Sequence, residues 1–433
     1  MDIDVDGGTG DGVVLLIGSG WRPYREYLLQ GLARQSALWL IGEEPATWQG
    51  PYIVGYSVVG ALDTERPVFD VRGLVDAARA VAAERKVVGV ITYDELLVTS
   101  AAQVAESLGV RGLTVAGAEN CRDKSRTRAA LTAAGLPQPR FALVDSLEAA
   151  SAAAAEIGYP VVVKPRGMGA SVGVMRAEHA EDLAGAFAIT ERARRTGPPV
   201  YEDGILIEEC VEGPEISVDG VVADGEYRAF CLARKQLGPP PCFEEVGHVV
   251  DAADPLLADP ELRAVLEGAH RVLGVLDGIT HTEVRLTSRG PVIIEVNARL
   301  GGDLIPYLGK LATGVDPGQV AAQAATGEAP SLQPTAHRTA GVRFLYPPED
   351  CRVTSVTLPD AADMPGVVDA YPIAQPGDIV RLPPNAHLGR YAFFVATADT
   401  PENCQAVLDE AAARTGLDYE PLGLDAAFEG RPW

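Results

Sequence analysis

The first third of the chain alternates apolar runs with amphipathic stretches. GVVLLIGSG (12–20) has the pattern of a buried strand that enters a glycine turn, and REYLLQGLARQ (25–35) has that of a helix behind it. Strand and helix patterns keep alternating to about residue 119. This order favours a mostly parallel sheet covered by helices, so residues 13–120 are predicted to form a doubly wound, Rossmann-like domain. The acidic, glycine-rich residues 1–12 are predicted to be disordered.

The pattern changes at residue 121. A helix is predicted to end at Gly135 and Pro137, and PVVVKPRGMGASVGVMRA (160–177) then has the pattern strand, glycine loop, strand. Residues 205–236 alternate β-branched and polar side chains between Asp-Gly turns, which indicates antiparallel strands. After residue 335, short strand patterns and a last helix predict a small α+β domain. The predicted fold class therefore combines α/β and α+β regions.

Two neighbouring strand patterns carry polar side chains on one face. HTEVRLT (281–287) and PVIIEVNARL (291–300) are joined by a Ser-Arg-Gly turn. Because side chains alternate along a strand with a period of two, each strand is predicted to present one polar row. The rows are His281, Glu283 and Arg285 in the first strand and Glu295, Asn297 and Arg299 in the second. The other face of the second strand, which includes Ile294 and Val296, is expected in the core.

Two carboxylates buried side by side are costly unless a cation lies between them. Glu283, Glu295 and the Asn297 amide offer hard oxygen ligands, which suit Mg²⁺ and leave positions for water and phosphate oxygens. A surface hairpin with solvated charges would give the same alternation. The strand pattern alone leaves both interpretations open.

The glycine loop has the composition of a phosphate-binding segment. Lys164 stands at a strand end, and its loop contains Gly167, Gly169, Ser171 and Gly173, whose backbone N–H groups can approach phosphates closely. A flexible hairpin tip explains these glycines equally well, and no Walker A sequence follows. The earlier stretch IGSGWRPY (17–24) lacks the third glycine of a dinucleotide fingerprint. We interpret it as a glycine turn, with a small-ligand contact as the second option.

Composition and charge limit the possible partners. With 433 residues, 47% of them hydrophobic, the chain has room for about three domains. Its formal net charge of −24 argues against nucleic acid or an anionic membrane as a partner, and an anionic substrate would need a local basic pocket. The chain has no apolar run of about 18 residues and no signal-peptide pattern, so a cytoplasmic protein is predicted. Six cysteines without a CxxC pair are predicted to be reduced structural thiols.

Several of these segments, taken in their order along the chain, resemble the ATP-grasp superfamily. They are DKSRTRAALTAAGLPQP, PVVVKPRGMGASVGV, ILIEECVEGPEISVDG, HTEVRLT and PVIIEVNARLGGDLI. The chain is most similar to the carboxylate–amine ligases that include the L-amino-acid (dipeptide) ligases. The resemblance implies an ATP-grasp fold with a pre-ATP-grasp domain (13–120), a lid region (121–204), a central domain with the Mg-ATP site (205–335) and a small C-terminal domain (336–433).

The resemblance also implies roles for matching residues. Lys124 and Lys164 would contact ATP phosphates beneath the glycine loop at 167–173. Glu208 and the backbone near Val211 would meet the adenine, and Glu215 would bind the ribose. Three residues would hold Mg²⁺, or Mn²⁺ in its place, and one would stabilise an acyl phosphate and the tetrahedral intermediate. The metal ligands would be Glu283, Glu295 and Asn297, and the catalytic residue Arg299.

Five further residues are candidates for substrate binding, and each also has a structural interpretation. His248 lies in a GHVV segment that lines the amino-acid pocket in similar ligases, but it could be an ordinary strand histidine. His281 could orient a ligand or make a structural hydrogen bond, and Lys235 could reach a phosphate or be solvated. Gly301 and Gly302 follow Arg299 and could offer N–H groups to a carboxylate, or simply begin a helix.

These expectations together predict an ATP-dependent ligase that joins small-molecule carboxylate and amine substrates, with amino acids as the expected substrates, and releases ADP and phosphate. A bicarbonate-activating enzyme similar to biotin carboxylase is the alternative within the superfamily. The alternative without catalysis is an inert ATP-binding module. Such a module would be expected to lose its metal ligands first, and the predicted metal ligands are all present. A homodimer is expected, because two-fold dimers are the commonest soluble oligomers and similar ligases often pair.

Overall fold

A fully buried strand, β1 (Val13–Ile17), lies inside the N-terminal sheet. The computed structural model describes residues 12–63, 66, 68–238 and 240–422, so the predicted disorder of residues 1–11 concerns a segment outside the described residues. The strand order is β3-β2-β1-β6 and every pairing is parallel, which confirms the predicted sheet. The elements are α1 (Arg22–Gln35), β2 (Ala37–Gly42), β3 (Gly55–Val58), β4 (Ala61–Asp63), β5 (Val68–Phe69), α2 (Val71–Glu84), β6 (Val87–Ile91), α3 (Val98–Leu108) and α4 (Val115–Arg122).

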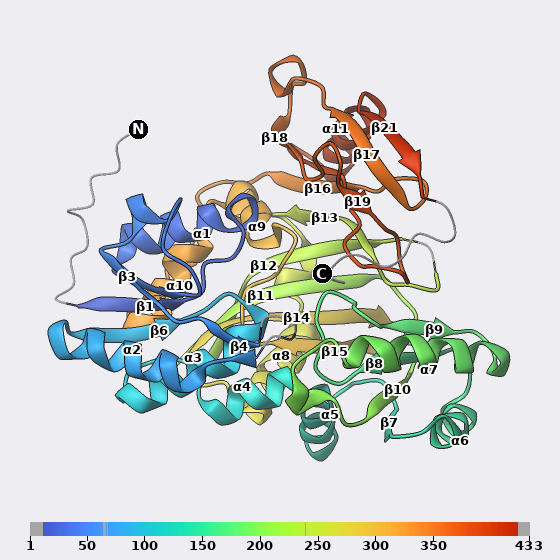
Figure 1. Cartoon of the computed structure of the whole chain (residues 1–433), viewed down its shortest axis with the longest axis horizontal. Coiled ribbons are helices and arrows are strands. Elements are labelled where there is room, and N and C mark those ends of the chain that lie inside the picture. The colour runs from blue at the N-terminus through green and yellow to red at the C-terminus, as the bar shows by residue number, and fades with distance from the viewer. Residues whose placement is uncertain (1–11, 64–65, 67, 239, 423–433) are drawn as a thin grey trace.

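A helix from much later in the chain completes this domain. α10 (Pro317–Thr326) packs against α1 and β6, while α2 and α3 cover the opposite face of the sheet (Figure 1). α1 and α10 approach closely, because a Cβ atom on Gly31 would lie 2.9 Å from the Cα atom of Gly318. Glycine at both positions therefore allows the two helices to touch through their backbones.

The lid is a four-stranded sheet in the order β7-β10-β8-β9, with two helices beside it (Figure 1). Its elements are β7 (Phe141–Val144), α6 (Leu147–Ile157), β8 (Val161–Pro165), β9 (Met175–Ala177), α7 (Ala180–Arg194) and β10 (Ile205–Glu209), and α5 (Lys124–Ala133) leads into it. β10 pairs with β7 and β8, not with a strand of the central sheet. The predicted boundary at residue 204 is therefore wrong, and Ile205–Glu209 belongs to the lid.

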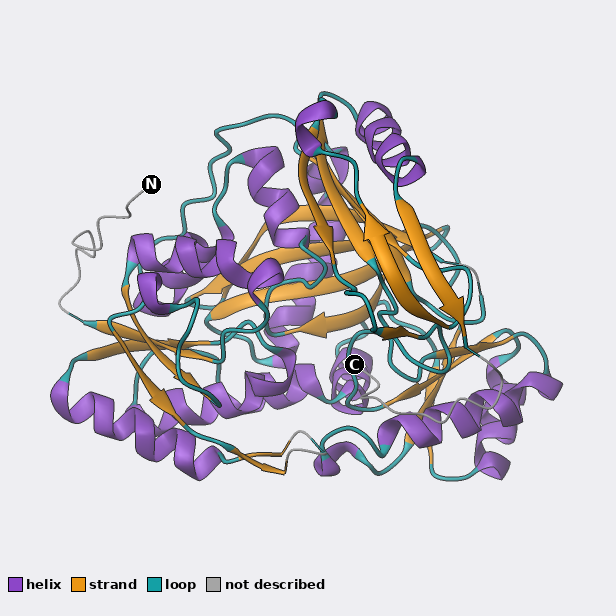
Figure 2. Cartoon of the chain, turned by 45° about the horizontal axis from the view of Figure 1, so that its top comes forward, coloured by secondary structure: helices purple, strands orange, loops and turns teal. Residues whose placement is uncertain are grey.

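The central sheet has eight antiparallel strands in the order β15-β14-β11-β12-β13-β16-β20-β18. Its strands are β11 (Glu215–Ala223), β12 (Glu226–Leu237), β13 (Glu245–Asp251), β14 (Gly278–Thr287), β15 (Gly290–Asn297), β16 (Thr339–Leu345), β18 (Val367–Pro372) and β20 (Ala392–Ala398). The last three come from the region predicted as a separate C-terminal domain. They continue the central sheet edge to edge, as Figure 2 shows. The C-terminal region is therefore joined rigidly to the central domain.

The remaining elements lie beside this sheet. They are α8 (Pro260–Leu273), α9 (Ile305–Thr313), β17 (Cys351–Thr357), β19 (Ile379–Val380), α11 (Pro401–Ala413) and β21 (Gly416–Pro421). β17, β19 and β21 form a small separate sheet. None of the helices in the described part of the chain has the length and apolar character needed to span a membrane.

A β-bulge changes the predicted face of one residue in β15. Glu283 pairs with Glu295, but the next residue, Val284, pairs with Ile293, so Ile294 is the extra residue. Ile293 is fully buried in the core with Val284, whereas Ile294 is only partly buried. Strict alternation had placed Ile294 in the core, and the bulge explains why that expectation is wrong.

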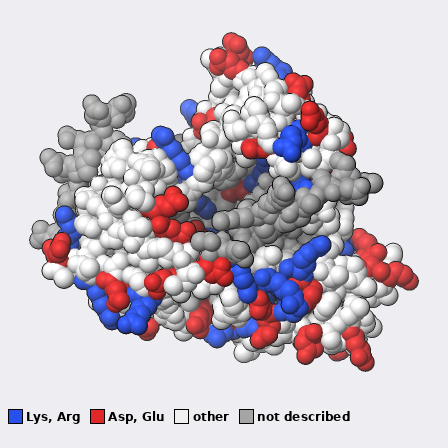
Figure 3. Space-filling view, viewed as in Figure 1, with Lys and Arg blue, Asp and Glu red and all other residues white. Residues whose placement is uncertain are grey.

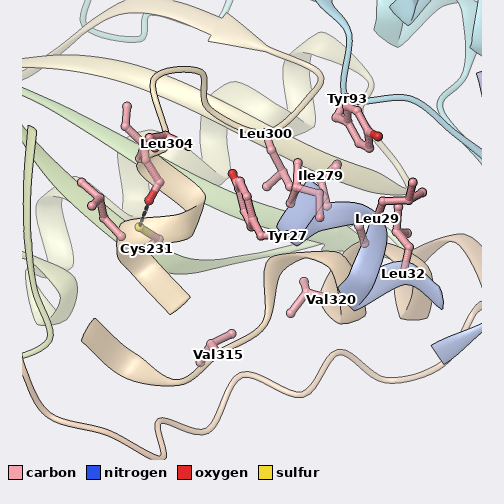
Figure 4. Packing of buried hydrophobic residues seen from close by; sticks show 14 of the residues in the cluster. Tyr27, Leu29, Leu32, Tyr93, Cys231, Ile279, Leu300, Leu304, Val315 and Val320 are labelled. Carbon is pink, nitrogen blue, oxygen red and sulfur yellow. Dashed lines mark hydrogen bonds between the residues drawn. The ribbon is translucent and has the colours of Figure 1, made fainter. Parts of the chain in front are cut away.

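One hydrophobic core connects the N-terminal domain to the central sheet. Figure 4 shows Tyr27 and Leu32 of α1 packed beside Ile279 of β14 and Val320 of α10. Cys231 of β12 points at the start of α9 in the same core, where its Sγ atom lies 3.8 Å from the Ile305 carbonyl oxygen. This shared core fixes the N-terminal domain over the sheet face that carries the polar rows.

Candidate functional site

A cavity of about 520 Å³ opens where the N-terminal domain, the glycine loop and the C-terminal region meet. Acidic and basic side chains are both visible in the hollow between these lobes (Figure 3). Six of the predicted site residues line the cavity: Gly169, Ser171, His281, Glu283, Arg299 and Gly302. The residues predicted to bind adenine and ribose are not in its lining. The cavity therefore includes part of the predicted phosphate and substrate side of the site, while Lys124, Lys164, Glu295 and Asn297 lie outside its lining.

The two polar rows meet on adjacent strands, as predicted. Glu283 on β14 and Glu295 on β15 are direct cross-strand partners, and His281 is the partner of Asn297. Directly opposite residues have Cβ atoms about 5 Å apart, so Glu283 and Glu295 are close neighbours, and Asn297 lies two residues beyond Glu295 on the same strand. Lys124 Nζ lies 3.0 Å from Glu295 Oε1. The donor set consists of oxygen atoms only, which fits the hard-ligand preference of Mg²⁺.

Lys235 lies at the centre of three carboxylates. Its Nζ atom is 2.6 Å from Glu245 Oε1, 2.7 Å from Glu283 Oε1 and 3.1 Å from Glu215 Oε1. Burial lowers the pKa of Lys235, but the three carboxylates outweigh this effect and raise its pKa well above the ordinary value. Burial also raises the pKa of Glu283, yet Lys235 and His281 bring it well below its usual range. The ammonium group is thus held charged beside the predicted metal ligands.

Glu215 and Glu208, predicted to face the nucleotide, both have cationic partners within the protein. Glu215 Oε2 lies 2.6 Å from Arg285 Nη2, and burial raises the pKa of Glu215. Glu208 accepts hydrogen bonds from Arg128 at 2.8 and 3.1 Å, and Lys164 Nζ is 2.7 Å from its Oε2 atom. Burial raises the pKa of Glu208, but the two cations bring it down to about 2. The nucleotide roles of Glu208, Glu215 and Lys164, and that of the buried Val211, stay predictions.

Arg299 is oriented by a residue that the sequence analysis missed. Its Nε atom donates to Glu95 Oε2 at 2.7 Å, and its Nη1 atom donates to the Leu300 carbonyl oxygen at 2.9 Å. Glu95 also lies 3.3 Å from the buried Arg122. Glu95 follows β6, at the carboxyl end of a parallel strand where α/β proteins commonly bind ligands. That position was the signal that could have identified it from the sequence.

A buried aspartate, Asp219, holds the turn that follows Arg299. Asp219 Oδ1 accepts from the Gly301 backbone N–H at 3.2 Å and is 2.6 Å from His281 Nδ1. Burial lowers the pKa of His281, but the hydrogen bonds to Asp219 and Glu283 and the charge of Asp219 together outweigh it, so the net shift of the pKa is upward. The Gly301 N–H is therefore already hydrogen-bonded to Asp219, and of the two predicted glycines after Arg299 only Gly302 lines the cavity.

The next two residues, Asp303 and Leu304, both have positive φ, at 51° and 63°. Such a backbone is costly for residues other than glycine and persists only where surrounding contacts impose it. Arg390, from the C-terminal region, donates to both Asp303 carboxylate oxygens at 2.7 and 2.6 Å. The fully buried His248 has its Nε2 atom 3.0 Å from Glu245 Oε2 and 3.5 Å from Asp303 Oδ2. His248 therefore supports the cavity wall from behind.

The glycine loop already contacts other parts of the chain. Lys124 Nζ donates to the Met168 carbonyl oxygen at 2.6 Å, and the Gly173 N–H donates to His387 Nε2 at 3.2 Å. A Cβ atom on Gly167 would lie 2.3 Å from the Tyr201 ring, so only glycine fits there. Ser171 itself has a positive φ of 55°. These contacts place the loop over the cavity as a lid would lie.

We expect bound ATP to protect the loop from proteolysis, because a loop that covers a ligand has to open for its entry. The measurement is limited trypsin digestion with and without Mg-ATP. Cleavage after Arg166 and Arg176 should slow with the nucleotide, whereas cleavage after the exposed Arg72 on α2 should not change. Equal protection of the loop in both conditions would contradict a lid role.

Comparison with known proteins agrees with this architecture. The family model of the ATP-grasp domain matches residues 157–307, and that of the L-amino acid ligase C-terminal domain 2 matches residues 343–420. An uncharacterised protein of Sinorhizobium fredii, y4rH, is 32% identical over 353 residues, which are 78% of this chain and 69% of that protein. The chain belongs to the ATP-grasp family of L-amino acid ligases. Membership of this family implies the use of ATP and Mg²⁺.

Two further proteins resemble this chain, one over part of the sequence and one in the fold. Alanine–anticapsin ligase of Bacillus subtilis is 32% identical over 279 residues, which are 60% of this chain and 57% of that enzyme. The match thus spans little more than half the length of this relative. The crystal structure of the L-amino acid ligase from Bacillus licheniformis has a TM-score of 0.77 at 22% identity, and the comparison covers 94% of this chain and 99% of that one. That likeness shows a shared fold.

Proposed function

We propose that this L-amino acid ligase family member joins the carboxylate of one amino acid, or a similar small metabolite, to the amine of another and releases ADP and phosphate. The observation that carries the proposal is the row of Glu283, Glu295 and Asn297 on paired strands, with Arg299 at the end of the row and facing the cavity. The cavity of about 520 Å³ falls within the usual range for small-molecule sites.

The chemistry requires an activated carboxylate, because a free carboxylate is a poor acyl donor at neutral pH. Attack of a carboxylate oxygen on the γ-phosphorus of ATP forms an acyl phosphate and releases ADP. The amine then attacks the acyl carbon, loses a proton and expels phosphate, which leaves the amide. Both steps place negative charge on oxygen atoms, so the site must present fixed positive charge.

We assign the metal to Glu283, Glu295 and Asn297, whose oxygens would hold Mg²⁺, or Mn²⁺ in its place. The bound metal would neutralise charge on the phosphate oxygens. Lys124 and Lys235, each ion-paired with one of these glutamates, lie where they could add positive charge. Arg299 has a planar, permanently charged guanidinium that suits a phosphate or an oxyanion, and Glu95 fixes its orientation.

Two alternatives make different predictions. An enzyme similar to biotin carboxylase would show ATP turnover that depends on bicarbonate and biotin, and the match of residues 343–420 to the L-amino acid ligase C-terminal domain disfavours it. An inert nucleotide-binding module would bind ATP without turnover, and the complete set of predicted metal ligands disfavours that. The expected homodimer stays a prediction.

The test is incubation of the purified protein with Mg-ATP and a matrix of paired amino acids. We expect phosphate and ADP release that depends on the pair, with a product mass equal to the two substrates minus water. Omitting either amino acid, or Mg²⁺, is the control and should stop product formation. ATP turnover driven by bicarbonate and biotin instead, or binding of ATP without turnover across the matrix, would contradict the proposal.

A further inference from the structure

Three arginines line the cavity, and one of them has no carboxylate partner among the described residues. Arg299 is paired with Glu95 and Arg390 with Asp303. Arg25, on α1, has only a hydrogen bond from its Nη1 atom to the Gly301 carbonyl oxygen at 3.3 Å. Its guanidinium also lies over the Tyr93 ring, 5.4 Å from the ring centroid. Neither contact neutralises its charge.

An unpaired arginine in the wall of a cavity is unexpected in a chain with a formal net charge of −24. Arginine matches the geometry of a carboxylate with two parallel hydrogen bonds, and it is favoured wherever carboxylates are recognised. The bond to Gly301 ties Arg25 to the turn that follows Arg299. An anion bound to Arg25 would therefore lie inside the same cavity, on the side formed by the N-terminal domain.

The turn before α1 is shaped to leave room for this side chain. Gly20 has a φ of 65°, and a Cβ atom there would lie 2.9 Å from Arg25 Cγ. Gly20 of IGSGWRPY thus leaves space for the Arg25 side chain. This observation supports the small-ligand interpretation of that segment.

An apolar wall lies next to Arg25. Trp21 and Tyr24 stack with their ring centroids 5.2 Å apart, and Ile373 and Leu388 of the C-terminal region line the same cavity. Trp21 is 46% exposed and Leu388 is 38% exposed, although both are large apolar residues. Exposed apolar side chains gathered at a cavity commonly mark a surface that a ligand covers.

We propose that Trp21, Tyr24 and Arg25 bind the amine substrate. Arg25 pairs with the free carboxylate of that substrate, and the wall of Trp21, Tyr24, Ile373 and Leu388 receives a large apolar side chain. The amine substrate is therefore an α-amino acid with an apolar side chain, not an amine without a carboxylate. This inference rests on the proposed function, because it assigns the second substrate of that reaction.

The test compares an amino acid with its carboxamide, which lacks the negative charge. L-leucine with L-leucinamide, and L-phenylalanine with L-phenylalaninamide, are assayed as amines with Mg-ATP and the acid found in the matrix. Arg25→Gln should raise KM for the amino acids by about 10- to 100-fold and change KM for the carboxamides by less than about twofold. Arg25→Lys should restore part of the preference, because it keeps the charge. Trp21→Ala should raise KM for leucine and phenylalanine more than for glycine.

Arg22→Gln is the matched control on the same helix. Arg22 pairs with Glu26 at 3.0 Å, its side chain is exposed and it does not line the cavity, so every KM should stay unchanged. Titration calorimetry of leucine and leucinamide with wild type and Arg25→Gln needs no turnover. It therefore tests the carboxylate contact even if no product forms, which separates failure of this inference from failure of the proposed function.

Equal losses for amino acid and carboxamide in Arg25→Gln would mean that Arg25 only supports Gly301, and would overturn the inference. A wild-type preference for glycine or for acidic amines over leucine and phenylalanine would overturn the apolar part. A rise in KM confined to the acid substrate would show that Arg25 binds the acyl donor instead.

Discussion

Arg299→Ala is expected to lower kcat for amide formation by at least about 100- to 1000-fold, the loss seen when one fixed oxyanion donor is removed. The reason is the position of the guanidinium, which faces the cavity and is held by Glu95 at 2.7 Å. If the proposed function is correct, the variant removes positive charge from the place where phosphate and the tetrahedral intermediate would form. The measurement is the initial rate of phosphate release with the productive substrate pair, beside the thermal unfolding midpoint.

Arg289→Ala is the matched control, because Arg289 lies in the turn between β14 and β15 and its side chain is 59% exposed. It should keep the wild-type rate. If Arg299→Ala retained near-normal amide formation with an intact fold, Arg299 could not be the residue that stabilises the developing charge. Glu95→Gln should have a smaller effect, since it changes only the support of Arg299.

Glu295→Gln is expected to lower kcat by about 1000-fold, equivalent to roughly 4 kcal/mol of transition-state stabilisation. The substitution keeps the size of the side chain but removes one of two carboxylates that face each other across β14 and β15. It also leaves Lys124 with the Met168 carbonyl oxygen as its partner, so the phosphate side of the site loses an organised ion pair. The measurement is turnover as a function of Mg²⁺ concentration, in which the Mg²⁺ required should rise.

Glu226→Gln, at the exposed start of β12, controls for the loss of one negative charge and should leave the Mg²⁺ dependence unchanged. Circular dichroism of Glu295→Gln would separate a metal defect from misfolding. An unchanged Mg²⁺ requirement with normal turnover would contradict the assignment of Glu295 to the metal.

The C-terminal region contributes to the cavity through Ile373 and through the loop that carries Leu388 and Arg390. His387 accepts a hydrogen bond from the glycine loop at Gly173 and lies 3.2 Å from Glu244, while Arg390 holds Asp303. Arg390 also lies over the Phe344 ring at 3.7 Å from the centroid, which fixes it against the central sheet. The C-terminal region therefore forms part of the cavity wall, and strands β16, β20 and β18 join it to the central sheet.

Local sequence patterns were sufficient for much of this fold. Alternating strand and helix patterns identified the parallel N-terminal sheet, and the period of two placed Glu283, Glu295 and Asn297 on one side of a hairpin. Both follow from backbone geometry within a few neighbouring residues, which a single segment reveals. The order of motifs then indicated the family that the comparisons show.

The tertiary structure alone decided the contacts between distant segments. Glu95 and Arg299 are 204 residues apart, and Arg25 and Gly301 are 276 apart, so no local period relates them. The membership of β10 in the lid sheet depends on its pairing with β7 and β8. The bulge at Ile294 arises from the pairing of β15 with β14, which strict alternation within one strand cannot reveal. The sequence by itself determined the parallel N-terminal sheet and the side of the hairpin on which Glu283, Glu295 and Asn297 lie, because both depend on local periodicity. Packing between domains decided which charges are paired and left Arg25 without a carboxylate among the described residues.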